Sequence, residues 1–221
     1  IVAAVTILIL LPLSPLLRRQ YNREGATDAE LAHAYPGDAR VLHPRQEYTR
    51  AITIDAPPSQ VWAYVIQLGQ ERGGMYSYDL LENLVGCAMH TVDHVVPAWQ
   101  TIQVGDLIRL GPKGKTYPIY KVAAYDPQHA LVVMGADPKT EQVPELAEPM
   151  PAQYVTASWA LCLEPIGTGA TRLISRWRLD YNGGAAMTLL WRITEVLNLV
   201  MERKMLATVK RLAERDSGRQ S

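Results

Sequence analysis

Residues 185–215, AAMTLLWRITEVLNLVMERKMLATVKRLAER, contain neither Gly nor Pro and set the architecture of the chain. Their apolar side chains recur every three or four positions, the spacing that gathers them on one face of an α-helix. They include Leu189, Leu190, Ile193, Val196, Leu197, Val200, Met201, Met205, Leu206, Val209 and Leu212. The stretch predicts one long amphipathic helix, with charged residues such as Glu195 and Glu202 mostly off its apolar face.

The apolar face of this helix needs a surface to cover it. Arg203, Lys204, Lys210 and Arg211 flank the face, so a membrane with anionic lipid is one alternative. Packing beneath a β-sheet of the same chain explains the face more simply.

The chain before this helix contains a series of short runs with strand character. Residues 48–55 alternate between apolar and polar side chains, which is typical of a half-buried strand. Further strands are expected at residues 101–104, 107–110, 119–125, 130–134, 155–164 and 171–179. Gly, Asp and Pro residues separate these runs, which favours an antiparallel meander. In the last run, Trp177 is expected to point inward, with Arg176 and Arg178 toward solvent.

Two short helices are expected after the first strand. Pro57 and Pro58 end that strand, and Ser59 is predicted to cap the first helix. Residues 78–85 have the pattern of the second helix. The fold class is therefore α+β, a curved antiparallel sheet wrapped around a long C-terminal helix. A concave sheet cannot pack flush on a straight helix along its full length, so a gap suited to an apolar ligand is expected between them.

Several local segments resemble one known superfamily. They are APPSQVW at 56–62, QLGQERGGMYSYD at 67–79, LENLVGC at 81–87, WQ at 99–100, VGD at 104–106 and MERKML at 201–206. Together they resemble the START-like helix-grip (SRPBCC) superfamily, which includes polyketide cyclase/dehydrase-like proteins, and within it a membrane-tethered bacterial branch. The resemblance covers about residues 35–214. It implies the helix-grip fold but no particular reaction, because kinship at the level of fold does not specify chemistry.

Composition excludes some classes of function. The chain has 22 Lys and Arg against 22 Asp and Glu, so it lacks the basic excess typical of nucleic-acid binding. Cys87 and Cys162 form no CxxC pair and are expected to be buried free thiols. His90 and His94 stand four residues apart but have no evident third ligand, so neither a metal nor a cofactor is predicted.

The first residues of the chain are expected to anchor it in a membrane. Residues 1–17 are almost wholly apolar, and Arg18, Arg19 and Arg23 follow them. This length is at the lower limit for a transmembrane helix, and the run begins without Met, so we expect part of it to be missing. The basic flank places the main domain in the cytoplasm by the positive-inside rule. A buried or interfacial helix is the alternative.

The remaining boundaries follow from changes in composition. We predict an anchor at 1–19, a linker at 20–46, one helix-grip domain at 47–216 and a disordered tail at 217–221. Within the linker, Thr27 and Glu30 have the spacing of a capping box at the start of a short helix.

The candidate site surrounds the expected gap. Its walls are predicted to come from the inner face of the last helix and from Trp62, Val65, Tyr76, Trp99, Trp159 and Trp177, with Gln67 and Arg72 orienting the polar end of a ligand. Arg72 suits a carboxylate or phosphate group, although an internal ion pair with Asp79 or Glu82 is the alternative. Weak candidates for acid or base catalysis are Tyr76, Asp79 and Glu82.

The leading functional hypothesis is binding of a small hydrophobic ligand, such as a lipid, an isoprenoid or a polyketide-like compound, at or near a membrane. The alternatives are an enzyme of the cyclase, dehydratase or hydrolase type, and a structural membrane-associated protein with a filled core. The predicted partners are the ligand and the membrane, and the sequence leaves protein partners open.

Overall fold

The computed structural model describes residues 15–145 and 151–219. Its centre is one six-stranded antiparallel sheet in the order β1-β6-β5-β4-β3-β2. The strands are β1 (Gln46–Ile54), β2 (Leu107–Arg109), β3 (Ile119–Asp126), β4 (Ala130–Ala136), β5 (Tyr154–Ile166) and β6 (Ala170–Asn182). These confirm the predicted strands except for residues 101–104. Those residues are irregular because Asp106 accepts a hydrogen bond from the Gln103 amide and closes a turn at Gly105, where φ is 99°.

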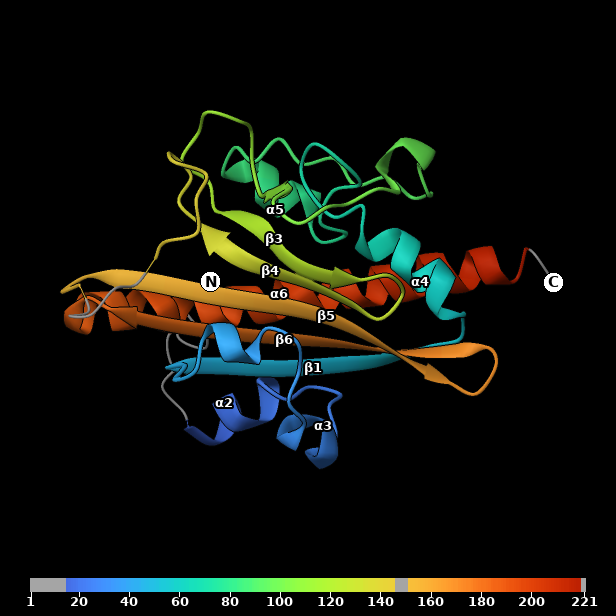
Figure 1. Ribbon diagram of the computed structural model, residues 1–221, viewed down its shortest axis with the longest axis horizontal. Coiled ribbons are helices and arrows are strands. Elements are labelled where there is room, and N and C mark those ends of the chain that lie inside the picture. Colours follow the sequence, from blue (N-terminus) through green and yellow to red (C-terminus); the bar gives the residue numbers. More distant parts are fainter. Residues whose placement is uncertain (1–14, 146–150, 220–221) are drawn as a thin grey trace, which may run out of the picture.

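The long helix α6 (Gly184–Ser217) crosses one face of the sheet, behind β5 and β6 in the view of Figure 1, and contacts β1 and β6. Its second half is buried through Met205, Leu206, Val209 and Leu212, as predicted. Its first half differs, because five apolar side chains there remain exposed. They are Leu189, Leu190, Ile193, Leu197 and Val200. The expectation that Glu195 and Glu202 lie off the packed face was wrong, since both are buried.

Two short helices lie on the same side of the sheet as α6. Helix α4 (Pro58–Val65) packs against α6, β5 and β6, and helix α5 (Asp79–Leu84) follows a glycine-rich loop. The predicted N-cap at Ser59 was wrong, because the helix begins at Pro58 with Pro57 as its N-cap. Proline suits the first helical position, here Pro58, because its φ is already helical and its missing N–H would have no partner in the first turn. A 3-10 turn, η3 (Pro97–Trp99), precedes β2.

The segment at 20–46, predicted as a linker, packs closely on the domain. Helix α2 (Pro15–Tyr21), helix α3 (Asp28–Ala32) and the 3-10 turn η2 (Asp38–Arg40) lie beside β1 (Figure 1). The Asn22 carbonyl accepts from the Thr49 amide at 2.8 Å, and the Glu24 carbonyl accepts from Ala51 at 3.1 Å. The segment therefore covers the free edge of β1. The capping box predicted at Thr27 and Glu30 is confirmed.

The same segment explains why the prediction that Arg176 and Arg178 of β6 point toward solvent was wrong. Trp177 points toward the concave face as predicted, so Arg176 and Arg178 point to the opposite face. Neither faces open solvent, because Asp38 of the N-terminal segment lies over both. The Arg176 Nη2 atom is 3.2 Å from Asp38 Oδ2, and Arg176 is only 5% exposed.

The predicted membrane anchor lies mostly outside the described residues. Residues 15–21 form α2, and residues 1–14 are not described. Among the described residues, no helix combines the length and the hydropathy needed to cross a bilayer. At the other end, α6 runs to Ser217, and the rest of the predicted tail forms a turn at 218–219 before the description ends.

Candidate ligand cavity

A cavity of about 550 Å³ lies between the sheet, α5 and the middle of α6. Most of its lining is apolar, and it comes from elements far apart in the sequence. The apolar lining includes Met75, Leu81, Leu110, Tyr120, Trp159, Trp177, Leu197, Met201 and Met205. The gap predicted between a curved sheet and a straight helix is therefore present in the described part of the chain.

Aromatic side chains from neighbouring strands form the floor of the cavity. Tyr48, Trp177 and Trp159 are register partners on β1, β6 and β5, so their side chains share the concave face. The rings of Trp159 and Trp177 are 6.3 Å apart, and Tyr120 of β3 meets Trp177 edge to face at 5.7 Å. These are favourable separations for aromatic pairs, which makes this wall rigid.

The two tryptophans of this wall differ in their hydrogen bonding. Trp159 Nε1 donates to Ser175 Oγ at 2.8 Å. Trp177 Nε1 is buried and has no partner among the described residues.

Two carboxyl groups line the cavity, and their surroundings differ. Glu202 of α6 is 6% exposed and pairs with Arg50 of β1, which is 1% exposed. Arg50 also donates to the Tyr21 carbonyl at 3.2 Å and lies over the Tyr48 ring. Glu82 of α5 has no cationic partner among the described residues. Burial, with a smaller contribution from the charge of Asp79, raises the pKa of Glu82 to about 7.

The structure brings only some of the predicted site residues to the cavity. Trp159, Trp177 and Glu82 line it. Trp62, Val65 and Tyr76 belong to the adjoining hydrophobic core rather than to the cavity wall.

Gln67 is fully buried and holds the loop that follows α4. Its Nε2 atom donates to Tyr76 Oη at 2.5 Å and to the His94 carbonyl at 2.9 Å. Its Oε1 atom accepts from the Val96 amide and from Gln100. Because both polar atoms of its side chain bond to loop residues, Gln67 stabilises the loop. Tyr76, which has a φ of 54°, is fixed by the same contact.

Arg72 and Trp99 lie together at a different hollow of about 310 Å³, which also includes Arg109. The Arg72 guanidinium donates to the carbonyls of Trp99 and Thr101, so it fastens the segment around η3. The ion pair with Asp79 or Glu82 predicted as an alternative for Arg72 does not form among the described residues, and Arg72 lies outside the lining of the larger cavity.

The three candidates for acid or base chemistry do not converge on the cavity. The Asp79 carboxylate accepts from the Thr91 amide at 2.7 Å and from its hydroxyl at 2.6 Å. Tyr76 accepts from Gln67, and burial raises its pKa to about 12. Of the three, Glu82 alone lines the cavity.

Several cavity residues were not predicted, above all Met75, Tyr120 and Glu202, whereas Met201 and Met205 belong to the helix face that was expected to line the cavity. One signal was available for Glu202. It stands three residues before Met205 and seven after Glu195, so it falls on the buried side of an ideal helix. A carboxylate within an apolar helical face is unusual and indicates a buried partner.

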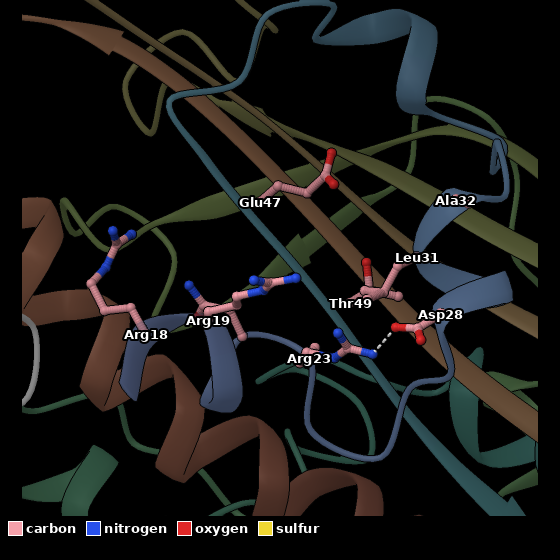
Figure 2. Close-up of a pocket in the computed structure, with 9 residues that line it drawn as sticks. Arg18, Arg19, Arg23, Asp28, Leu31, Ala32, Glu47 and Thr49 are labelled. Carbon is pink, nitrogen blue, oxygen red and sulfur yellow. Dashed lines mark hydrogen bonds and ion pairs between the residues drawn. The ribbon is translucent and has the colours of Figure 1, made fainter. Parts of the chain in front are cut away.

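A second large hollow, of about 560 Å³, lies beside the β1 edge and is polar. Figure 2 shows Arg18, Arg19 and Arg23 on one side of it and Glu47 and Thr49 of β1 on the other. Arg23 pairs with Asp28, and Arg18 bonds Glu195 of α6. Its mixed charges do not suit an apolar ligand.

The described residues hold no group of three or more potential metal ligands. His90 and His94 are exposed, and both cysteines are buried free thiols.

Comparison with known proteins gives matches only among solved structures. No family model matches the chain, and no curated protein does so. The chain is similar to protein MLL2253 from Mesorhizobium loti, with 15% identity over 77% of this chain and 98% of that one, at a TM-score of 0.44. It is also similar to the Polyketide_cyc-like protein Cgl2372 from Corynebacterium glutamicum, with 17% identity over 77% and 92%, at a TM-score of 0.42. A third similar structure is that of Ara h 8.0201, with 13% identity over 76% of this chain and 97% of that one, at a TM-score of 0.43. By its own element order, its antiparallel sheet and the helix across the concave face, the chain has the helix-grip fold.

Proposed function

We propose that this protein binds a small hydrophobic ligand in the cavity between the aromatic wall and α6. The observation that supports this most directly is the cavity itself, which has a volume of about 550 Å³ and a mostly apolar lining. Binding pockets for small molecules are typically roughly 300–1,000 Å³ and carry a few polar groups among apolar ones. A structural protein with a filled core would not leave such a space, because protein interiors are close-packed.

The ligand is best sought in protein purified from its own membrane and analysed by native mass spectrometry. We expect a mass increment from a noncovalent apolar molecule that is lost after denaturation and organic extraction. If protein isolated in this way never carries an increment, and does not take one up from added membrane extract, the proposal fails.

We further propose that the cavity opens toward a lipid bilayer and that the main domain lies on its cytoplasmic side. Three exposed apolar residues at the cavity support this: Leu84 is 75% exposed, Val85 68% and Leu197 55%. The apolar run at 1–17 is followed by Arg18, which bonds Glu195 two residues from Leu197. An anchor at this point would bring the exposed apolar side chains to the membrane surface, where they lose contact with water.

A further inference from the structure

Three buried polar atoms have no partner among the described residues although their side chains line the cavity. They are Trp177 Nε1, Glu82 Oε2 and Glu202 Oε1. A buried polar atom without a hydrogen bond is costly, so such atoms usually have a partner from the protein, a water or a ligand. One of these atoms can only donate, and a carboxylate oxygen can only accept.

The charges around the cavity restrict the ligand further. None of the described residues that line it is Lys, Arg or His, whereas Glu82 and Glu202 both line it. Arg50 pairs with Glu202 but does not itself line the cavity, and its Nη2 atom has no partner among the described residues. An anionic ligand would therefore meet two carboxyl groups and no cationic side chain in the described lining, which is unfavourable in a buried site.

Trp177 and Glu202 lie beside two neighbouring side chains of β1, Tyr48 and Arg50. The Tyr48 ring stacks on Trp177 at 6.3 Å, and the Arg50 guanidinium that holds Glu202 lies 4.9 Å from the centre of that ring. The side chains that carry this donor and this acceptor are thus connected through Tyr48 and Arg50, two residues of β1.

We propose that the ligand is a neutral hydrophobic alcohol or phenol, whose hydroxyl oxygen accepts from Trp177 Nε1 and whose hydroxyl proton is donated to Glu202. This inference rests on the proposed function, since it assigns the chemical class of the ligand to the same cavity. A neutral ligand of this kind excludes fatty acids and other anions. Anions had been favoured by the expectation that Arg72 lies at the ligand.

Isothermal titration calorimetry of the full chain with naphthalene, 2-naphthol and 2-naphthoate tests this inference, because the three probes differ only in their polar group. At neutral pH we expect 2-naphthol to bind about tenfold more tightly than naphthalene, and 2-naphthoate to bind more weakly than either. Trp177→Phe should remove most of the preference for naphthol over naphthalene. Trp99→Phe is the matched control and should keep both the binding and the preference, because Trp99 lies at the other hollow and not in the cavity.

Each outcome separates the two proposals. If naphthalene binds but naphthol binds no more tightly, or if the preference survives in Trp177→Phe, the alcohol assignment is wrong and the apolar cavity stands. Tightest binding of naphthoate also overturns the assignment. If none of the three probes binds, the proposed function itself fails.

Discussion

Glu82 shows how burial of one side chain ties the stability of the fold to pH. Its pKa rises from an ordinary value of 4.5 to about 7, because α5 holds the carboxyl group away from water and near Asp79. The folded chain therefore binds a proton at Glu82 between these two pH values that the unfolded chain has released. By linkage, this group lowers the free energy of unfolding as the pH rises through that window.

The substitution Glu82→Gln removes this dependence. We expect the melting temperature of the wild type to fall relative to that of the variant as the pH rises from 4.5 to about 7, the range set by the two pKa values. Thermal unfolding of both proteins across this range measures the difference. Asp79→Asn should weaken the dependence without removing it, because the charge of Asp79 makes the smaller contribution to the raised pKa of Glu82. Parallel curves for wild type and Glu82→Gln would show that Glu82 titrates normally.

At the scale of elements, the N-terminal segment carries most of what the sequence did not reveal. Residues 22–24 cover the edge of β1 through backbone hydrogen bonds, and any residue type can make such bonds. Their polar composition therefore looked like that of a linker. The capping box at Thr27 could be predicted because its two side chains bond each other locally.

The exposed side chains of α5 lead to a prediction about the membrane. Hydrogen exchange of the full chain is measured with and without vesicles of phosphatidylcholine and phosphatidylglycerol. We expect slower exchange of the amides at 80–85 and 189–200 with vesicles, because docking would protect these segments from local opening. The amides of α4, which is largely buried against α6, are the internal control and should not change. Unchanged exchange at 80–85 would contradict the proposal that the cavity opens onto lipid.

At the scale of the whole molecule, the sequence was informative wherever local periodicity decides structure. The stripe ending in Leu212 identified α6, and alternation identified the strands that place Trp159 and Trp177 in the cavity. Periodicity does not show how much of a stripe a sheet covers, so the exposed Leu189 and Leu197 could not be foreseen. Periodicity also does not show which polar side chains use their hydrogen bonds within a loop. Gln67 and Arg72 were expected at the ligand, and both instead hold loop backbone.

The most direct measurement is the fluorescence of N-phenyl-1-naphthylamine titrated with the full chain and with two tryptophan substitutions on α6. Met201 lines the cavity, whereas Ala207 lies on the exposed side of the same helix. We expect saturable enhancement of fluorescence with the wild type and with Ala207→Trp, and at least about tenfold weaker binding to Met201→Trp, because the indole ring would fill the space of the ligand. Equal binding to Met201→Trp and Ala207→Trp, with both variants folded, would show that the cavity is not the binding site.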